Sequence, residues 1–384
     1  MRVGILTGEY PPLQGGVGAY SRILAHELAR QNHSVAVISA QAARETDPMI
    51  NLSPAVARWG WSALRAVRRW TQAHRLDVVN LQYQTAAYQM SPWIHFLPEA
   101  VQPTPVVTTF HDLRVPYLFP KAGPLRNWMV MRLARASAGV IATNDEDFAR
   151  LSGLPCAALV PIGSNILSPL PADFNPQPWR AQAGAGIEDF LIAYFGLFNR
   201  SKGLDLLLKS VSQLRADGVP ARLLLIGGGA GSSDPTNLES MRHLEALIGQ
   251  LELGAFIRRT GYLEDEAQVG AFLAASDAVA LPFVDGASFR RGSLMAAIHY
   301  GCAIVTTVPA VPVPAFVDGD NLLLAPANDV QALAEALHRL WNSPALRARL
   351  RAGAARLAGS FTWPKIAQAC ADCFACAIEK SDRA

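Results

Sequence analysis

The sequence contains no long hydrophobic run, and this absence excludes the simplest way of crossing a membrane. A membrane-spanning helix needs about 18 to 20 consecutive apolar residues, and no segment of the 384-residue chain reaches that length. The apolar stretch near the amino terminus is also short, because Glu9 closely follows it. Such a stretch is too short for the core of a signal peptide. We therefore expect a soluble, cytoplasmic protein.

The chain also lacks an excess of charge of either sign. It holds 34 lysines and arginines against 31 aspartates and glutamates, which gives a formal net charge of +3. Nucleic-acid binding needs a concentrated basic face, so this balance argues against a nucleic-acid partner. The charge is unevenly divided, because residues 1–168 carry a net charge of +5 and the remainder carries −2.

Cysteines are few, and their odd number argues against a disulfide framework in a cytoplasmic chain. Three of the five form the pattern Cys370-x-x-Cys373-x-x-Cys376. On a helix these thiols spread over about 9 Å of rise and about 120° of arc, so one metal ion cannot easily gather them. We expect buried small side chains here and no metal site.

Short apolar runs alternate along the chain with helical patterns, which predicts parallel sheets covered on both faces. Helices are expected between the strands, for example at 204–216 and 266–275. The expected strands are 2–7, 34–39, 77–82, 105–110, 139–143, 158–162, 190–195, 222–227, 256–260, 278–282, 303–307 and 322–325.

Four prolines between Ser168 and Trp179 interrupt this alternation. Proline disfavours both helix interiors and central strands, so we interpret 169–179 as a linker. The expected organisation is one doubly wound domain at 1–168 and a second at 180–362. Ligands of such sheets bind at the carboxyl ends of the strands, and two such domains leave a cleft between them.

The first candidate site follows the first strand, where Gly15 and Gly16 precede a helix. Adjacent glycines let backbone N–H groups approach an anion at a helix amino terminus. The alternative is a flexible turn. The spacing is not Gly-x-Gly-x-x-Gly, which argues against a dinucleotide-binding oxidoreductase. His111 follows the strand at 105–110, where a histidine either meets a ligand or is structural.

The second candidate site is the loop Gly196 to Gly203, which leaves the first strand of the second domain. Arg200 and Lys202 stand just before a helix, and cations at a helix amino terminus form a diphosphate site that needs no metal. The alternative is a solvated basic turn.

A third candidate lies between Pro282 and Leu294, again after a strand and before a helix. Gly292, Ser293 and Leu294 can offer backbone N–H groups and a hydroxyl to an anion, and Arg290 and Arg291 add charge. A capped helix with an exposed arginine pair is the alternative.

Two weaker signals point to ordinary structure. The acidic run Asp145-Glu146-Asp147 follows Asn144, a good helix cap, and acids favour a first helical turn over a metal site here. A glycine-rich loop at 227–231 follows a strand but is weak evidence alone.

Taken together, these residues resemble the retaining glycosyltransferases of family 4, an α/β family with the GT-B fold. The resemblance runs nearly end to end and implies two Rossmann-like domains, with a terminal helix at 363–384 that crosses back to the first. The matching features are Gly15, Gly16, His111, Gly196, Lys202, Gly203, 261–263, Pro282, Gly301, 318–324 and 361–363.

The resemblance implies transfer of a sugar from a nucleotide-sugar to a glycan or lipid-linked acceptor, with neither metal nor other cofactor. Lys202 would hold the diphosphate, and His111 would face the transferred sugar. Donor contacts are assigned to Gly15, Gly16, Gly196, Asn199, Tyr262, Leu263, Arg290, Gly292, Ser293 and Leu294. Sugar or acceptor contacts are assigned to Glu9, Gln14, Ser288 and Phe289.

The chain departs from the family at two glutamates with seven residues between them, whose positions hold Ser288 and Ala296 here. We expect Asp285 to replace a lost carboxylate. The family has a basic residue just after the first glycine of the phosphate loop, and Leu197 occupies that position here. Arg200 would then supply the missing charge. The missing glutamates leave open a noncatalytic scaffold or partner subunit of polysaccharide biosynthesis, and an epimerase is a further alternative.

A basic and aromatic stretch at 58–70 predicts a membrane surface as a further partner. It mixes three tryptophans with four arginines, a composition that suits the headgroup layer of an anionic membrane. We expect peripheral contact with the inner face of the cytoplasmic membrane. An ordinary helix packed on the sheet, with solvated arginines, is the alternative.

Overall fold

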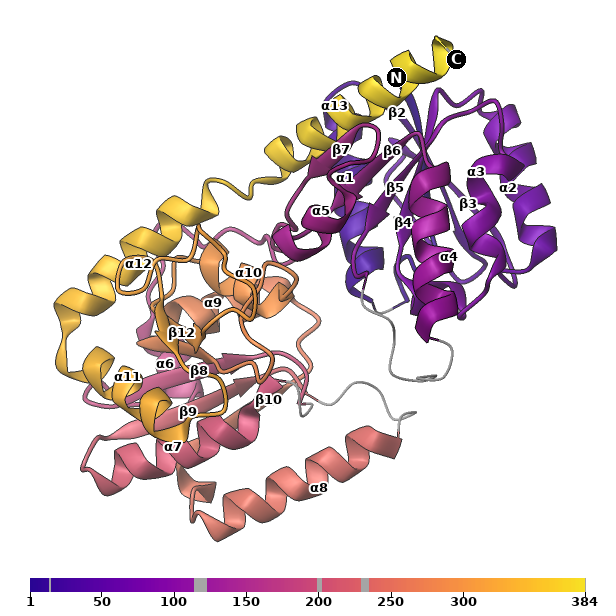
Figure 1. Ribbon diagram of the computed structural model, residues 1–384. Helices are drawn as coiled ribbons and strands as arrows, with labels where there is room; N and C mark the ends of the chain where they lie inside the picture. Colours follow the sequence, from indigo (N-terminus) through magenta and orange to yellow (C-terminus); the bar gives the residue numbers. More distant parts are fainter. Residues whose placement is uncertain (14, 114–122, 199–201, 229–234, 384) are drawn as a thin grey trace. The chain divides into compact units, whose positions relative to one another are not determined.

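The computed structural model describes residues 1–13, 15–113, 123–198, 202–228 and 235–383, and Figure 1 shows its elements. The chain divides into two compact units. The first unit combines Met1–Asn165 with Phe361–Ala384, and the second is Ile166–Ser360. Both ends of the chain therefore belong to the first unit.

The first unit is built on a parallel sheet of seven strands in the order β3-β2-β1-β4-β5-β6-β7. The order reverses between β1 and β4, so the topological switch point lies at their carboxyl ends. The strands are β1 (Arg2–Thr7), β2 (Ser34–Ala40), β3 (Ile50–Val56), β4 (Val78–Tyr83), β5 (Val106–Phe110), β6 (Gly139–Ala142) and β7 (Ala157–Leu159).

One strand of this sheet, β3, is not predicted by the sequence pattern. It contains Pro54, which cannot donate a backbone hydrogen bond and therefore obscures a strand in the sequence. The structure places β3 at the edge of the sheet, paired only with β2. An edge strand tolerates proline because one side of it makes no ladder.

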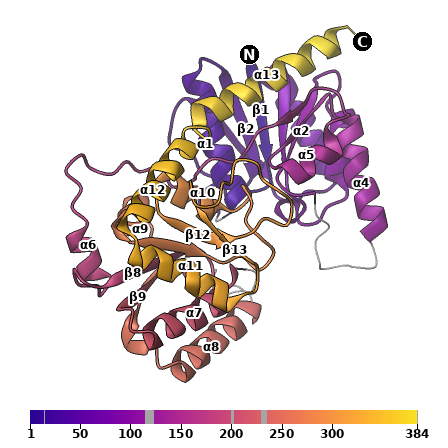
Figure 2. The ribbon, with the colours of Figure 1, turned by 60° about the vertical axis from the view of Figure 1, so that its left-hand side comes forward.

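Helices cover both faces of this sheet, as Figure 2 shows.

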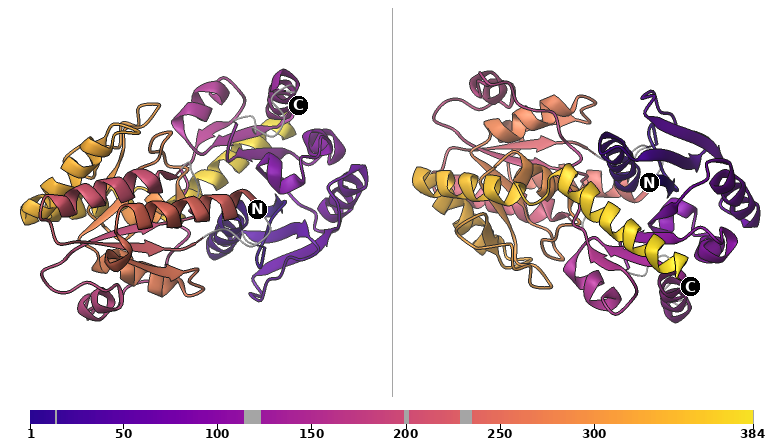
Figure 3. Two further views of the ribbon diagram at one scale, coloured as in Figure 1. Left: turned by 90° about the horizontal axis from the view of Figure 1, so that it is seen from below. Right: turned by 90° about the horizontal axis from the view of Figure 1, so that it is seen from above.

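The chain's last helix, α13, packs on α1 and lies against the indigo-to-purple unit in Figure 3. Trp363 fixes its start, because Nε1 donates to the Ser164 carbonyl at 2.8 Å. The predicted return of the terminal helix to the first domain is confirmed. The helices are α1 (Gly16–Arg30), α2 (Trp61–Ala73), η1 (Thr85–Tyr88), η2 (Trp93–Phe96), α3 (Leu97–Ala100), α4 (Gly123–Ala136), α5 (Asp145–Leu151) and α13 (Trp363–Asp382).

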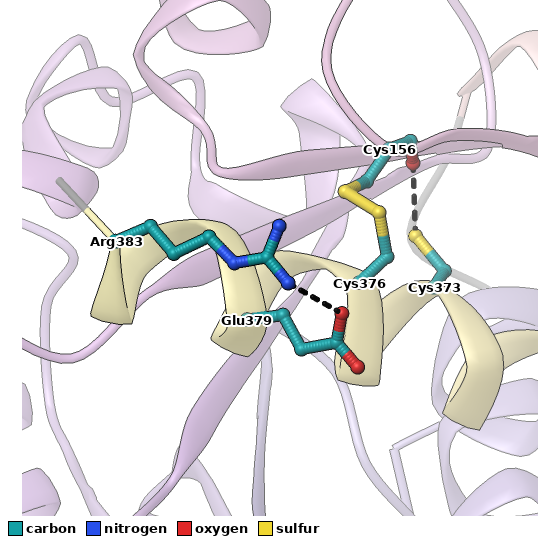
Figure 4. The surroundings of a disulfide bond; sticks show 5 residues. All are labelled: Cys156, Cys373, Cys376, Glu379 and Arg383. Atoms are coloured by element: carbon teal, nitrogen blue, oxygen red, sulfur yellow. Dashed lines mark hydrogen bonds and ion pairs between the residues drawn. A yellow bond between two sulfur atoms is a disulfide. The ribbon is translucent and has the colours of Figure 1, made fainter.

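A disulfide between Cys156 and Cys376 ties α13 to the start of β7 (Figure 4). The expectation that no cysteine is bridged is therefore wrong, because folding brings together two thiols that are 220 residues apart in sequence. The other cysteines, Cys302, Cys370 and Cys373, are free and buried. The Cys373 thiol donates to the Cys156 carbonyl at 3.1 Å, so Cys373 and Cys376, on successive turns of α13, both contact Cys156 just before β7.

The second unit repeats the doubly wound plan with a six-stranded parallel sheet in the order β10-β9-β8-β11-β12-β13. Its strands are β8 (Phe190–Phe195), β9 (Ala221–Ile226), β10 (Ile257–Gly261), β11 (Ala278–Leu281), β12 (Ile304–Thr307) and β13 (Leu323–Ala325). Its helices are α6 (Gln177–Gln182), α7 (Leu204–Ala216), α8 (Pro235–Gln250), η5 (Gly254–Phe256), α9 (Glu266–Ala275), α10 (Gly292–His299), α11 (Val330–Asn342) and α12 (Pro344–Ala358).

The proline-rich segment is irregular up to Pro176, and α6 then begins within it at Gln177. Pro178 occupies the first turn of α6, where a missing N–H costs no helical hydrogen bond. Among the described helices, none combines the length and the apolar character needed to cross a membrane.

Candidate functional site

The carboxyl end of β1 carries a half-buried carboxylate, Glu9, beside the glycines that open α1. A Cβ atom on Gly15 would overlap the Glu9 carboxylate, and one on Gly18 would lie 3.1 Å from the Glu9 carbonyl oxygen. The glycines therefore allow this loop to fold tightly. A Cβ atom on Gly16 would meet no described atom within 4 Å, so the start of α1 is open. Burial raises the pKa of Glu9.

His111 lies at the carboxyl end of β5, two strands away from β1 in the same sheet. Its side chain is buried, and Nε2 lies 2.8 Å from Oε1 of Gln82 on β4. The ring of Tyr20, from α1, packs edge-on against it at 4.9 Å between centroids. Burial lowers the pKa of His111 to about 4, so the imidazole is neutral at pH 7. The site therefore holds His111 as a hydrogen-bonding group rather than a cation.

The acidic run at 145–147 contacts the backbone that follows His111. Asn144 caps α5, as predicted, by accepting the Asp147 N–H at 3.0 Å. The Asp147 carboxylate in turn accepts the Leu113 N–H at 3.3 Å, which ties the end of β5 to α5. Within the described ranges, no group of three or more histidine, cysteine, aspartate or glutamate side chains is arranged to hold a metal ion.

In the second unit, Gly203 joins the two candidate loops. Its φ of +68° lies in the left-handed region, and a Cβ atom there would overlap the Pro282 carbonyl oxygen. Any residue with a side chain would therefore be both strained and obstructed at this position. Glycine lets the loop after β8 pack directly on the loop after β11.

Lys202 and Arg291 both approach the ring of Phe283 at this junction. The Lys202 Nζ lies 5.2 Å and the Arg291 Cζ lies 4.8 Å from the ring centroid. Asp285 forms an ion pair with Arg291. Burial, reinforced by the charge of Arg291, lowers the pKa of Lys202 to about 8. The loops thus concentrate positive charge at the carboxyl edge of the sheet.

Ser293 completes this edge from the first turn of α10. Its hydroxyl is buried and has no hydrogen-bond partner among the described residues. A Cβ atom built on Gly196 would lie 3.8 Å from it, so the hydroxyl adjoins the glycine that ends β8. A buried hydroxyl without a partner is costly, and one at a helix amino terminus is suited to an anionic oxygen of a ligand.

The remaining predicted residues have different surroundings. Tyr262 is exposed, whereas Phe289 is buried against Phe316 at 4.7 Å between centroids, which leaves the backbone of Phe289 as its polar contact group. The Ser288 carbonyl accepts the Arg291 N–H at 3.1 Å. Gly292 is exposed at the start of α10, Leu294 is buried, and Leu263 and Arg290 are half-buried. Gln14, Asn199 and Arg200 lie outside the described residues.

Three residues that shape the site are not predicted by the sequence pattern: Gln82, Tyr20 and Phe283. Gln82 is the one with a readable signal, because it alternates with Asn80 inside an otherwise apolar strand. Two polar side chains on one face of a central strand indicate a buried polar network rather than a core.

Two family profiles match the chain, one in each unit. "Glycosyltransferase Family 4" matches residues 14–158, and "Glycosyl transferases group 1" matches residues 189–343. With the two doubly wound sheets, they define the class as glycosyltransferases of the GT-B fold. The chain belongs to glycosyltransferase family 4, a family of retaining enzymes, which confirms the resemblance. It is a nucleotide-sugar-dependent glycosyltransferase, which favours the enzyme over the scaffold and epimerase alternatives.

Curated relatives span the whole chain at low identity. The D-inositol 3-phosphate glycosyltransferase of Xylanimonas cellulosilytica is 26% identical over 99% of this chain and 97% of its own length. The phosphatidyl-myo-inositol mannosyltransferase of Mycobacterium leprae is 26% identical over 96% of this chain and 94% of its own.

Solved structures share the fold. Sucrose-phosphate synthase from Thermosynechococcus elongatus has a TM-score of 0.76 at 20% identity, covering 97% of this chain and 98% of its own. HepE from Anabaena, solved with UDP-glucose, has a TM-score of 0.73 at 18% identity, covering 97% of this chain and 98% of its own. At such identities these likenesses show the fold alone.

Proposed function

We propose that this enzyme transfers a sugar from a nucleotide-sugar to a hydroxyl of a glycan or lipid-linked acceptor, with the anomeric configuration retained and without a metal ion. The observation that carries this proposal is the unpartnered hydroxyl of Ser293 at the start of α10. It adjoins Gly196, and Arg291 lies two residues before Ser293 in the sequence. A diphosphate at this position receives a hydroxyl, backbone N–H groups and cationic side chains together.

The donor diphosphate gains negative charge as its bond to the sugar breaks. Lys202 and Arg291 supply the opposing charge from two loops that Gly203 and Phe283 hold together. Fixed charges of this kind stabilise a leaving group most in the transition state, which is where they accelerate the reaction. This set of groups takes the place that a divalent cation has in metal-dependent transferases.

Asp285 acts through Arg291 in this proposal. It pairs with the Arg291 guanidinium and so fixes one of the two cations that face the diphosphate. Asp285 thereby supplies the carboxylate of a donor loop in which Ser288 and Ala296 stand where the family commonly has glutamates.

The first unit supplies the groups for the transferred sugar and the acceptor. Neutral His111 contacts a sugar hydroxyl, and the open start of α1 at Gly16 faces the acceptor side. Glu9 contributes a carboxylate with a raised pKa that accepts a hydrogen bond from an acceptor hydroxyl.

A panel of UDP, GDP, ADP and their sugars, scored by thermal shift, tests the donor site. A ligand that binds only the folded protein raises the melting temperature by mass action, so the nucleotide that stabilises most identifies the donor base. Lys202→Ala should abolish this stabilisation, whereas Lys209→Ala, an exposed lysine of α7, should preserve it. If no member of the panel stabilises the wild-type protein, the proposed donor site is wrong.

We also propose that the first unit attaches to an anionic membrane surface, such as the inner face of the cytoplasmic membrane. Of the three tryptophans in 58–70, Trp59 and Trp70 are buried in the core, and Trp61 is 53% exposed. Trp61 packs edge-on against Trp93 of η2 at 5.3 Å. Trp93 is itself exposed, so two elements contribute to one aromatic patch.

Basic side chains accompany this patch along α2, because Arg65, Arg68 and Arg69 are all exposed. The neighbouring helix α4, which packs on η2, exposes Leu125 and Trp128 as well. Shallow tryptophans with arginines match an anionic headgroup layer, where each basic residue contributes about 1 kcal/mol of attraction.

Co-sedimentation with vesicles that contain an anionic phospholipid tests this attachment. We expect binding at low salt that weakens as salt increases, and loss of binding when Arg65, Arg68 and Arg69 are changed to glutamate. The same change at Arg347 and Arg349 of α12, in the second unit, is the control. Equal binding of both variants, or no binding of the wild type, would refute the attachment.

A further inference from the structure

A row of buried polar side chains runs beneath His111 through β4 and β5. Asn80, Gln82 and Thr109 are each completely buried, and they link to the imidazole through hydrogen bonds. None of these three side chains carries a charge. A buried polar network is stable only when its donors and acceptors match, so the direction of each bond can be followed from a fixed end.

The fixed end is the backbone carbonyl of Val107. A carbonyl oxygen only accepts, so the Asn80 atom 3.0 Å from it must be the Nδ2 donor. Asn80 Nδ2 also donates to the Thr109 hydroxyl at 2.9 Å. This orientation leaves Asn80 Oδ1 as an acceptor for the Gln82 side chain, which donates to it through Nε2.

The hydrogen bonds continue from Gln82 to His111. Because Gln82 Nε2 faces Asn80, its Oε1 faces the imidazole, 2.8 Å from His111 Nε2. An amide oxygen only accepts, so His111 Nε2 must carry the proton. In the neutral ring the other nitrogen, Nδ1, then carries a lone pair.

We propose that Gln82, oriented by Asn80, is a positioning residue that fixes His111 in its Nε2–H tautomer, so that Nδ1 meets the substrate as a hydrogen-bond acceptor. The role toward substrate rests on the proposed function, whereas the tautomer rests on the network alone. Among the described residues, no hydrogen bond to Nδ1 competes with a substrate hydroxyl. The Tyr20 ring, packed edge-on, also restricts rotation of the imidazole.

The electrical surroundings of His111 agree with a neutral ring. The group that contacts it from β4 is the uncharged Gln82 amide, and the titratable group packed on it from α1 is the Tyr20 phenol. Tyr20 in turn adjoins the Cys370 thiol of α13, 3.9 Å from its hydroxyl. Asp147 of α5 faces the backbone at Leu113. Burial alone lowers the pKa of His111.

The direct test is nitrogen NMR of the histidine side chains in the intact protein. The signals of His111 are identified as those that disappear in the His111→Asn variant. We expect a protonated Nε2 and an unprotonated Nδ1 that do not change between pH 6 and pH 8. An Nδ1–H tautomer, or a mixture of the two, would overturn the proposal. This measurement needs no substrate, so it remains decisive even if no sugar transfer is found.

The second test replaces the acceptor of the Nε2 proton by a charged one. In Gln82→Glu a carboxylate next to His111 favours the imidazolium, which puts a proton on Nδ1. We expect the pKa of His111 to rise from about 4 to about 6. The kcat of the variant should then fall roughly tenfold between pH 7 and pH 5, a fall that the wild type should not show, with a smaller change in the donor KM.

Gln84→Glu is the matched control. This substitution introduces the same charge just after β4, at a residue outside the hydrogen-bond network described above. It should leave the His111 tautomer and the pH profile unchanged. A Gln82→Glu enzyme that keeps its pH 7 kcat at pH 5, although His111 is largely protonated there, would overturn the role of Nδ1 as acceptor. If Gln82→Glu does not fold, the tautomer of the wild-type protein decides alone.

Discussion

Lys202 and Arg291 approach the same aromatic ring, that of Phe283, although they lie 89 residues apart in the sequence. Two cations are brought together because Gly203 allows the loop after β8 to pack on the loop after β11. Their mutual repulsion is part of the reason that the pKa of Lys202 is lowered, together with its burial. Asp285 pairs with Arg291, so these three side chains keep a net positive charge and are prepared for an anionic ligand.

Removing the Lys202 charge should damage turnover far more than folding. We expect Lys202→Ala to lose on the order of 100-fold in kcat, as when a preorganised transition-state donor is removed. Lys209→Ala, on the helix α7 that follows Lys202, is the control for a lost lysine. Steady-state kinetics with the donor found by thermal shift measure the effect, and near-normal turnover in a folded Lys202→Ala protein would exclude this role.

The lowered pKa of Lys202 also predicts an alkaline limit to activity. Since the pKa is about 8 in the free enzyme, Lys202 loses its proton as the pH rises through that value. The parameter kcat/KM, which reports the free enzyme, should fall above about pH 8. Lys202→Arg keeps its charge and should move this limit upward. A profile that is flat to pH 10 in the wild type would contradict the prediction.

Asp285 should affect the same limit, because its charge favours the protonated form of Lys202. Asp285→Asn removes that charge and releases Arg291. We expect the alkaline limit to move to lower pH by about half a unit, the size typical of a half-exposed ion pair. Asp217→Asn, at the exposed end of α7, is the control. An unchanged limit in Asp285→Asn would favour a turn residue without influence on the site.

The disulfide between Cys156 and Cys376 should stabilise the first unit. A cross-link over 220 residues restricts the unfolded chain, and native bridges contribute about 2 to 4 kcal/mol. Cys376→Ser should therefore lower the urea midpoint, and reductant should lower the wild-type midpoint but leave that of the variant unchanged. Five reactive thiols in the denatured, unreduced protein would show that the bridge is absent.

Much of the architecture follows from the sequence alone. The runs 190–195, 204–216 and 266–275 coincide with β8, α7 and α9, because apolar periodicity and the neighbouring turns agree there. The edge strand β3 was missed because Pro54 disguises it. The disulfide was missed because the pairing of Cys156 with Cys376 depends on where α13 packs, and no local pattern encodes that.

The candidate site was predicted only in part, and the reason is physical. Lys202, Ser293 and His111 stand at strand ends and helix starts, which sequence spacing identifies. Their partners Phe283 and Gln82 do not stand out, because an apolar ring and a strand amide gain their roles from contacts across the sheet.

The most direct test of the account is the anomeric configuration of the product, determined by NMR in the presence of EDTA. The α-linked nucleotide-sugar that gives the largest thermal shift would be offered with inositol phosphate or phosphatidylinositol vesicles, the acceptors that the names of the curated relatives indicate. We predict an α-linked product, formed at the same rate with and without the chelator. A β-linked product, or a rate that is lost to EDTA and restored by Mg²⁺ or Mn²⁺, would contradict the account.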